Sequence, residues 1–252
     1  MILSSRVPAK PSFATSHMKL HDSANILRFG APLTEARGAI ILIHGRGSSA
    51  DDISRLAETL PSEGLAFLAP SATGGVWYPQ RFLAALELNE PALSVALNTI
   101  DELVSEITRA RIPGTQIGLV GFSQGACLAL EYAVRHPLRY AFVASLSGAL
   151  IGPLTTPRAS ADLQGTPVLL GCAERDAHIP LPFVEQSADT LTRFGASVTK
   201  QIYPGSAHTV FPEEIDWLSR KPGADNPYWT RSAGPFRLSD LPRTLSVRGP
   251  RG

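Results

Sequence analysis

Short apolar runs alternate with amphipathic stretches through the middle of the chain. Six runs of four to six residues are typical of strands buried on both faces of a parallel sheet: 39–43, 65–69, 117–120, 141–146, 168–171 and 198–203. Between them, apolar residues recur at helical spacing, which predicts helices over 51–60, 91–109, 126–134, 183–194 and 211–218. Strands that alternate with helices indicate an α/β fold, with a mostly parallel sheet and helices on both of its faces.

The two ends of the chain differ in composition from this middle part. Residues 1–18 are rich in Ser, Pro and Ala and show no periodicity, which predicts an N-terminal arm. Within it, Ser16-His17-Met18 is typical of an expression-vector junction, so part of the arm need not be native. Residues 219–252 are dense in Pro, Gly and Arg and predict a C-terminal extension. A single domain over 19–218 lies between them, without an internal repeat.

Composition narrows the class of protein. The chain has 252 residues, of which 44% are hydrophobic and 18% charged, as expected for one domain with a large core. A net charge of +1 gives no indication of a nucleic-acid partner or of binding to an acidic membrane surface. No run reaches the ~18–20 apolar residues of a membrane span, and the first residues do not resemble a secretory signal, so we expect a cytoplasmic protein. Two cysteines, Cys127 and Cys172, are too few for a zinc site built from cysteines and are predicted to be buried free thiols.

The sequence Gly121-Phe122-Ser123-Gln124-Gly125 carries the clearest chemical signal. It fits the G-x-S-x-G nucleophile elbow, a tight turn between a strand and a helix. An apolar run precedes it and a helical pattern follows it, which is the context that the motif requires. Its glycines leave room for the turn, and Ser123 is predicted to present its hydroxyl as a nucleophile at the start of the helix.

A serine nucleophile needs a base that removes its proton, and the base needs an acid that orients it. Where this elbow occurs in α/β proteins, the acid and then the base follow the serine along the chain. His208 lies in the loop after the 198–203 run and is predicted to be the base. His178 is excluded as the base because it lies only two residues after Asp176, too close for the pair to come from different strand ends.

Two acids, Glu174 and Asp176, follow the 168–171 run, and both can reach the base. Asp176 is favoured because the intervening Arg175 lets the loop leave the sheet before the carboxylate is presented. The alternative role of Asp176 is that of a loop residue capping the turn from Ile179 onward.

An oxyanion hole needs two backbone N–H groups at the strand ends. Gln124, directly after the nucleophile, provides one by its position, and the loop His44-Gly45-Arg46-Gly47 is the natural source of the other, through Arg46. His44 is predicted to be a structural residue of this loop. The Arg46 side chain is expected in solvent, or alternatively in contact with an acidic substrate.

These segments together resemble the phospholipase/carboxylesterase family of α/β hydrolases. The likeness extends from about residue 39 to 218 and rests on four motifs: Leu42-Ile43-His44-Gly45-Arg46-Gly47, Gly121 to Ala126, Asp176 with Ile179-Pro180, and Pro204-Gly205 leading to His208. The resemblance implies an α/β-hydrolase fold and a serine esterase without cofactor or metal, acting on small-molecule carboxylic esters or thioesters. It also implies a triad of Ser123, Asp176 and His208, with Arg46 and Gln124 at the oxyanion-hole positions.

The same resemblance places Trp77, Tyr78 and Phe82 in the segment that lines the acyl side in bacterial members. Plain core packing is the alternative for these rings. Arg46-Gly47-Ser48 stands where thioesterases usually have a leucine followed by Gly-Asp, which favours a bacterial carboxylesterase acting on short- to medium-chain or aryl esters.

Several other functions stay open. Within the fold these are an acyl thioesterase, a lysophospholipase, a hydroquinone-linked hydrolase or a cofactor-free lyase. Outside it they are a binding protein with an idle triad, or an interaction protein that uses the C-terminal extension. A homodimer is also compatible with the sequence.

Overall fold

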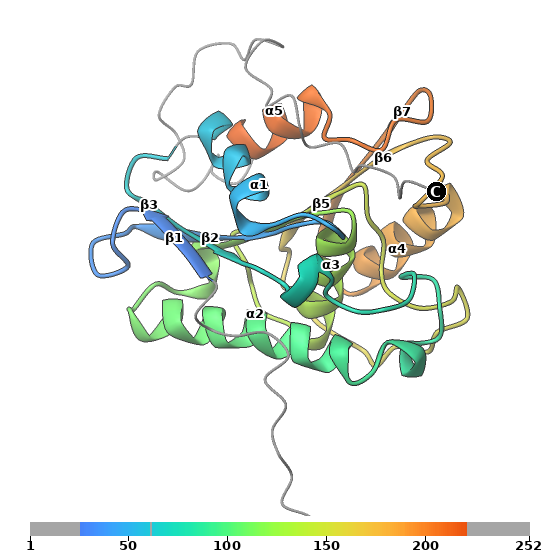
Figure 1. Ribbon diagram of the computed structural model, residues 1–252, viewed down its shortest axis with the longest axis horizontal. Coiled ribbons are helices and arrows are strands. Elements are labelled where there is room, and N and C mark those ends of the chain that lie inside the picture. Colours follow the sequence, from blue (N-terminus) through green and yellow to red (C-terminus); the bar gives the residue numbers. More distant parts are fainter. Residues whose placement is uncertain (1–25, 61, 221–252) are drawn as a thin grey trace, which may run out of the picture.

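The computed structural model describes residues 26–60 and 62–220 (Figure 1). The predicted arm at 1–18 and almost all of the extension at 219–252 lie outside these residues. No helix within the described ranges is long and apolar enough to cross a membrane.

A seven-stranded sheet forms the centre of the molecule, in the order β1-β3-β2-β4-β5-β6-β7. Every neighbouring pair is parallel except β1 with β3, which is antiparallel. The strands are β1 (Ile26–Gly30), β2 (Gly38–Ile43), β3 (Leu65–Pro70), β4 (Ile117–Phe122), β5 (Phe142–Leu146), β6 (Pro167–Ala173) and β7 (Ser197–Tyr203).

Helices cover both faces of this sheet. The longer helices α2 (Ala92–Arg109), α3 (Gln124–Arg135) and α4 (Leu181–Arg193) lie on one face, and α1 (Ala50–Ser54) and α5 (Pro212–Arg220) on the other (Figure 1). The layered arrangement confirms the predicted α/β fold with a mostly parallel sheet. It also explains why β2 to β5 are buried along their whole length and read as apolar runs without alternation.

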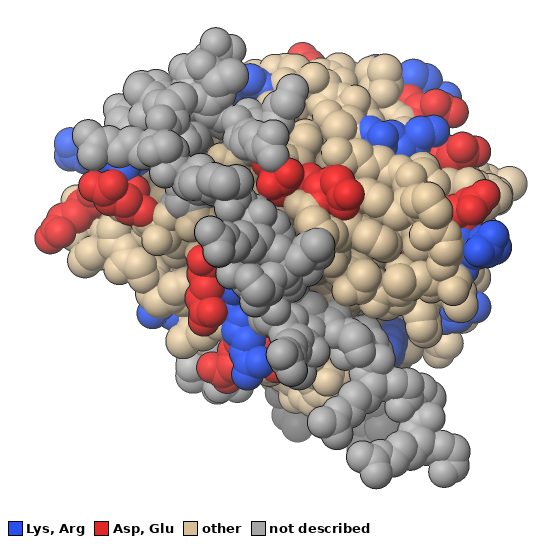
Figure 2. Space-filling model, turned by 90° about the horizontal axis from the view of Figure 1, so that it is seen from above, with Lys and Arg blue, Asp and Glu red and all other residues tan. Residues whose placement is uncertain are grey.

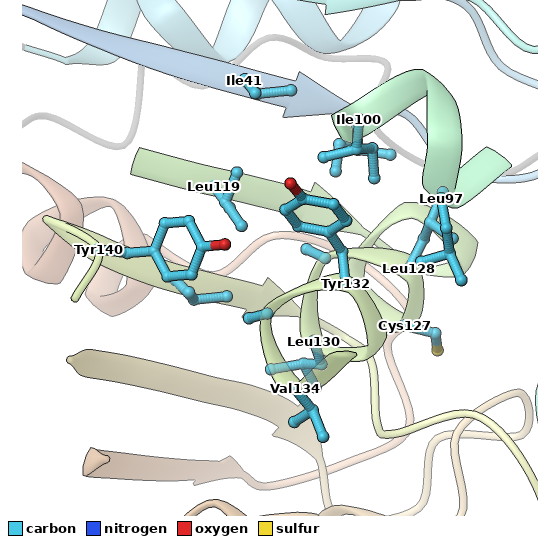
Figure 3. Packing of buried hydrophobic residues seen from close by; sticks show 14 of the residues in the cluster. Ile41, Leu97, Ile100, Leu119, Cys127, Leu128, Leu130, Tyr132, Val134 and Tyr140 are labelled. Carbon is cyan, nitrogen blue, oxygen red and sulfur yellow. The ribbon is translucent and has the colours of Figure 1, made fainter. Parts of the chain in front are cut away.

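The sheet divides the hydrophobic core into two clusters. The larger one packs between the sheet and α2, α3 and α4, and Figure 3 shows part of it, with Ile100, Leu119, Tyr132 and Tyr140. The two tyrosine hydroxyls reach polar partners, the Asp101 carboxylate at 3.0 Å and the His136 carbonyl at 2.7 Å. The smaller cluster lies under α1 and α5. Cys127 and Cys172 are buried free thiols, as predicted.

The structure differs from the sequence-based prediction at several elements. Strand β1 was not predicted; it is a short, partly buried edge strand, so its apolar pattern is weak. The helix predicted over 51–60 is α-helical only to Ser54 and continues as a 3₁₀ helix over Arg55–Thr59. Leu60, which precedes a proline in the sequence, has extended backbone angles, the conformation favoured at such positions. Helix α5 runs two residues beyond 218, to Arg220.

Charged side chains are mixed over the surface. On the face shown in Figure 2, Lys and Arg are interspersed with Asp and Glu among uncharged residues. The visible part of this face therefore carries no broad area of one charge.

Candidate active site

The candidate site lies at one edge of the sheet, where the parallel strands end. The loop of His44 follows β2, Ser123 follows β4, Asp176 lies in the loop after β6, and His208 in the loop after β7. Side chains that are far apart in sequence meet there because the carboxyl ends of parallel strands share one edge.

Ser123 occupies a strained turn between β4 and α3. Its backbone angles, φ 53° and ψ −115°, lie in a region that residues with side chains rarely adopt. Its N–H donates to the Leu146 carbonyl of β5 at 2.9 Å, which ties the turn to the neighbouring strand. A Cβ atom on Gly121 would lie 2.2 Å from the Gly125 carbonyl oxygen, and one on Gly125 would lie 2.1 Å from the Ile43 carbonyl oxygen. Only glycine fits at these two positions.

Ser123, His208 and Asp176 form a continuous hydrogen-bonded chain. The Ser123 Oγ lies 2.8 Å from His208 Nε2, and His208 Nδ1 lies 2.6 Å from Asp176 Oδ2. With the Nδ1 proton donated to the carboxylate, Nε2 is left to accept the serine proton. The arrangement therefore has the geometry of a nucleophile, a general base and an orienting acid.

Asp176 is buried and fully engaged. Its Oδ1 accepts the backbone N–H groups of His178 at 2.7 Å and Ile179 at 3.1 Å, while its Oδ2 accepts from His208. Burial alone would raise the pKa of Asp176, but the hydrogen bond and charge of His208, with the two backbone donors, hold the pKa below its usual value. The carboxylate is thus kept ionised, as an orienting acid must be. The structure places the alternative acid, Glu174, in an exposed position 3.8 Å from Arg175.

One hydrogen bond holds the loop of His208, and two rings pack against its imidazole. The Ser147 hydroxyl donates to the Thr209 carbonyl at 3.1 Å, which ties the histidine loop to the end of β5. The ring centroids of Phe122 and His178 lie 5.2 Å and 4.7 Å from the centroid of the His208 ring.

His178 is a neighbour that the sequence did not reveal. Burial, and then the proximity of His208 and Arg81, lower its pKa, although Asp176 opposes this. The guanidinium of Arg81 donates to the carbonyls of Ala177 and His178, at 3.4 and 3.2 Å, and so joins two loops that are far apart in sequence. No periodicity or motif marks such a contact.

Both residues predicted as oxyanion donors adjoin the elbow: Gln124 follows Ser123 directly, and Arg46 follows Gly45, which packs on the elbow. Gln124 is the first residue of α3, so its N–H has no acceptor within the helix and lies at the positive end of the helix dipole. Gly45 packs so closely on the elbow that a Cβ atom there would lie 3.4 Å from Ser123 Cβ. This contact brings the following peptide, with the Arg46 N–H, to the same edge.

The side chains of Gln124 and Arg46 bind backbone groups of residues 77–80. Gln124 Oε1 accepts the Trp77 N–H at 3.0 Å, and Gln124 Nε2 donates to the Tyr78 carbonyl at 2.8 Å. The expectation of a solvated Arg46 side chain is wrong: it is partly buried, and its Nη2 donates to the carbonyls of Tyr78 and Gln80 at 2.7 and 2.8 Å. Burial lowers the pKa of Arg46. Both side chains hold the 77–80 segment against the elbow.

The structure places the three aromatic rings of the predicted acyl side in the core. Trp77 and Tyr78 are 0% and 1% exposed and Phe82 is 5% exposed, as core packing would have them. The Trp77 indole N–H donates to the His44 carbonyl at 2.8 Å, and His44 itself is buried and accepts the Ala72 N–H at 3.0 Å. These bonds agree with the structural role expected for His44. Direct contact of the three rings with a substrate stays a prediction.

Comparison with known proteins shows which proteins the chain is similar to. A model of the phospholipase/carboxylesterase family matches residues 24–220. A solved phospholipase/carboxylesterase from Dyadobacter fermentans is 37% identical, with a TM-score of 0.76, and the match covers 80% of this chain and 97% of that protein. Acyl-protein thioesterase 1 of Saccharomyces cerevisiae is 26% identical over 223 residues, which cover 77% of this chain and 96% of the yeast protein. Acyl-protein thioesterase 2 of Zea mays, at 24% identity and a TM-score of 0.60 over 79% of this chain and 99% of that protein, shares the fold.

Proposed function

Because the chain belongs to the phospholipase/carboxylesterase family of α/β hydrolases, and is thus a hydrolase of esters or thioesters, we propose that it is a serine carboxylesterase. Ser123 is the nucleophile, His208 the general base and Asp176 the acid that orients it. The observation that carries the proposal is the unbroken hydrogen-bonded chain, with 2.8 and 2.6 Å links, from the serine hydroxyl to a buried carboxylate.

The mechanism follows from this chain. The Ser123 Oγ attacks the carbonyl carbon of the ester while His208 Nε2 takes the hydroxyl proton. The oxygen of the resulting tetrahedral intermediate, which gains the negative charge, accepts hydrogen bonds from the N–H groups of Arg46 and Gln124. As the intermediate collapses, the bond to the leaving oxygen breaks, and the leaving alcohol takes the proton from His208.

Deacylation repeats the same steps with water. His208 removes a proton from water, the hydroxide attacks the acyl carbon, and the bond to Ser123 Oγ breaks. The proton then returns to Ser123 Oγ, so the enzyme is restored and a carboxylic acid is released. Asp176 stays ionised and stabilises the imidazolium in both halves.

The aromatic residues near the site support a preference for short- to medium-chain or aryl esters. Phe82 packs edge-on against Phe183 of α4, with ring centroids 5.3 Å apart, so the packing around this segment is apolar. Thioester hydrolysis is the second candidate, supported by the match to the yeast thioesterase over most of both chains.

The test is a panel of 4-nitrophenyl esters and matched thioesters of increasing acyl length, assayed on the wild type and on Ser123→Ala. We expect hydrolysis by the wild type to be highest for short and medium oxygen esters, and to vanish in Ser123→Ala. Ser105→Ala, an exposed serine on α2, is the matched control and should behave as the wild type. Activity of Ser123→Ala near that of the wild type would refute the proposal, and a higher kcat/KM on the thioesters would select the second candidate.

A further inference from the structure

A cavity of about 400 Å³ lies between α4 and the loop that follows β5. It is distinct from the hydrogen-bonded chain of Ser123, none of whose three residues lines it. Its lining residues, all within the described part of the chain, are Leu150, Gly152, Pro153, Thr156, Arg158, Ser160, Phe183, Gln186, Ser187, Thr190, Arg193 and Phe194. We call it the Arg158 cavity.

The charge of the Arg158 cavity is one-sided. Two arginines and no Asp or Glu belong to its lining. Behind the wall, the buried Glu131 carboxylate accepts from Arg158 Nη1 and from Arg135 Nε, each at 2.8 Å. One carboxylate therefore pairs with two guanidinium groups, and the three groups together carry a net charge of +1.

Arg158 is held in place as a binding residue would be. Its side chain is 12% exposed, and besides the bond to Glu131 it donates through Nη2 to the Ile151 carbonyl. A guanidinium has five N–H donors in a planar fork, so donors remain for a further acceptor. Arg193, at the end of α4, donates to the Thr190 hydroxyl at 3.0 Å and adds a second cation to the lining.

The remainder of the wall is partly apolar. Phe183, Phe194 and Leu150 provide carbon surface, and Ser187 ties two walls together by accepting the Leu150 N–H at 2.9 Å. Phe183 is also the ring that packs on Phe82. A volume of about 400 Å³ lies within the range of ~300–1,000 Å³ found for small-molecule sites.

We propose that the Arg158 cavity binds a compact organic acid. The carboxylate meets the guanidinium groups of Arg158 and Arg193, and the apolar body lies against Phe183 and Phe194. The proposal does not depend on the esterase function. The acid is either the distal end of an ester substrate or a separate molecule, and the experiment distinguishes these two sources.

The test is a ¹⁹F NMR titration of the full-length protein with 4-fluorobenzoate at constant ionic strength. We expect saturable binding that weakens by about tenfold or more in Arg193→Gln and in Arg158→Lys, since each substitution removes charge-assisted or forked hydrogen bonds. Arg158→Lys keeps a cation for Glu131 and so protects the fold. Arg109→Gln, an exposed arginine on α2, is the matched control and should bind as the wild type does. The uncharged 4-fluorobenzamide should not compete.

Two results would overturn the proposal: the absence of binding, or binding that is equally strong in both cavity variants. In the second case the acid lies elsewhere, for example at the oxyanion donors. Titration of Ser123→Ala gives the same readout without hydrolysis, so loss of the esterase function leaves this test intact. With binding established, a rise of KM in Arg193→Gln for an anionic half-ester, but not for its neutral methyl ester, identifies the acid as part of the substrate. Unchanged KM for both identifies a separate ligand.

Discussion

At the residue scale, the site depends on the strained backbone of Ser123 and on the Asp176 carboxylate, both of whose oxygens accept hydrogen bonds. Ser123 is held at φ 53° because Leu146 accepts its N–H and glycines at 121 and 125 allow the turn. Asp176 accepts two backbone donors and the imidazole of His208. Both groups are thus oriented before a substrate arrives, which lowers the cost of reaching the transition state.

Asp176→Asn tests the orienting role. The amide can present its N–H to His208 and stabilise the wrong tautomer, so we expect kcat/KM on 4-nitrophenyl butyrate to fall by about 10³- to 10⁴-fold. Glu174→Gln, the other acid of the same loop, should leave kcat/KM unchanged. Circular dichroism checks that both variants are folded. Equal losses in the two variants would contradict the assignment of the acid.

Chain order and loop position were enough to predict which serine, acid and histidine meet. They were not enough for the contacts made by the ends of side chains. For Gln124 only a role of its N–H was predicted, and its side-chain amide also binds the backbone of Trp77 and Tyr78. The Arg46 guanidinium was expected in solvent and instead caps carbonyls of the same segment. Such contacts depend on loop conformations, which periodicity does not encode.

At the element scale, the elbow joins β4 and α3 at a point where backbone atoms touch. Gly125→Ala would place a methyl group 2.1 Å from the Ile43 carbonyl oxygen of β2, and the buried strand cannot move away. We expect the free energy of unfolding to fall by about 2 kcal/mol or more, as for overpacked cores. Denaturant unfolding measures it.

Gly47→Ala is the matched control for the elbow. Gly47 has a positive φ, of 74°, which Gly125 does not, but a Cβ atom there meets nothing within 4 Å. The substitution therefore adds backbone strain of about 1 kcal/mol without a clash. A loss in Gly47→Ala as large as that in Gly125→Ala would show that the close packing of the elbow is not what requires glycine.

Helix α5 carries a buried acid that makes stability depend on pH. Glu214 is 0% exposed; its Oε2 accepts the Phe211 N–H at 2.7 Å, while Oε1 has no partner and lies against Gly171. Burial raises the pKa of Glu214 to about 8. The unfolded chain releases this proton near pH 4.3, whereas the folded protein keeps it. The free energy of unfolding must therefore decrease as pH rises from about 4.3 to about 8.

Glu214→Gln removes this titration. We expect the free energy of unfolding of Glu214→Gln, relative to wild type, to increase steadily from pH 5 to about pH 8. Glu102→Gln, which removes an exposed acid on α2, should follow the wild-type pH dependence. Urea unfolding at several pH values measures both. Identical pH slopes in Glu214→Gln and wild type would contradict the account.

At the scale of the whole molecule, the parallel sheet brings four loops to one edge. Continuous apolar runs predicted this sheet because helices cover both of its faces. Strand β1 was missed because it pairs only at the edge, antiparallel to β3, and is only partly buried. The 3₁₀ continuation of α1 was missed because its apolar residues keep a helical spacing. Strands that helices cover on both faces are thus recognisable in the sequence as apolar runs, whereas a partly buried edge strand is not.

A chain reduced to residues 24–220 tests where the domain ends. Both core clusters and the hydrogen-bonded chain lie within these residues, and the family match covers the same range. We expect the shortened chain to keep the melting temperature and the kcat/KM of the full-length protein. Loss of either would show that the ends of the chain contribute to the domain.

The most direct test of the central claim is covalent labelling with a fluorophosphonate, followed by intact-protein mass spectrometry and peptide mapping. These reagents react with a serine that a neighbouring base has activated. The account predicts a single adduct on Ser123 in the wild type, much slower labelling in His208→Ala, and none in Ser123→Ala. An adduct on another residue, or equally rapid labelling of Ser123→Ala, would contradict it.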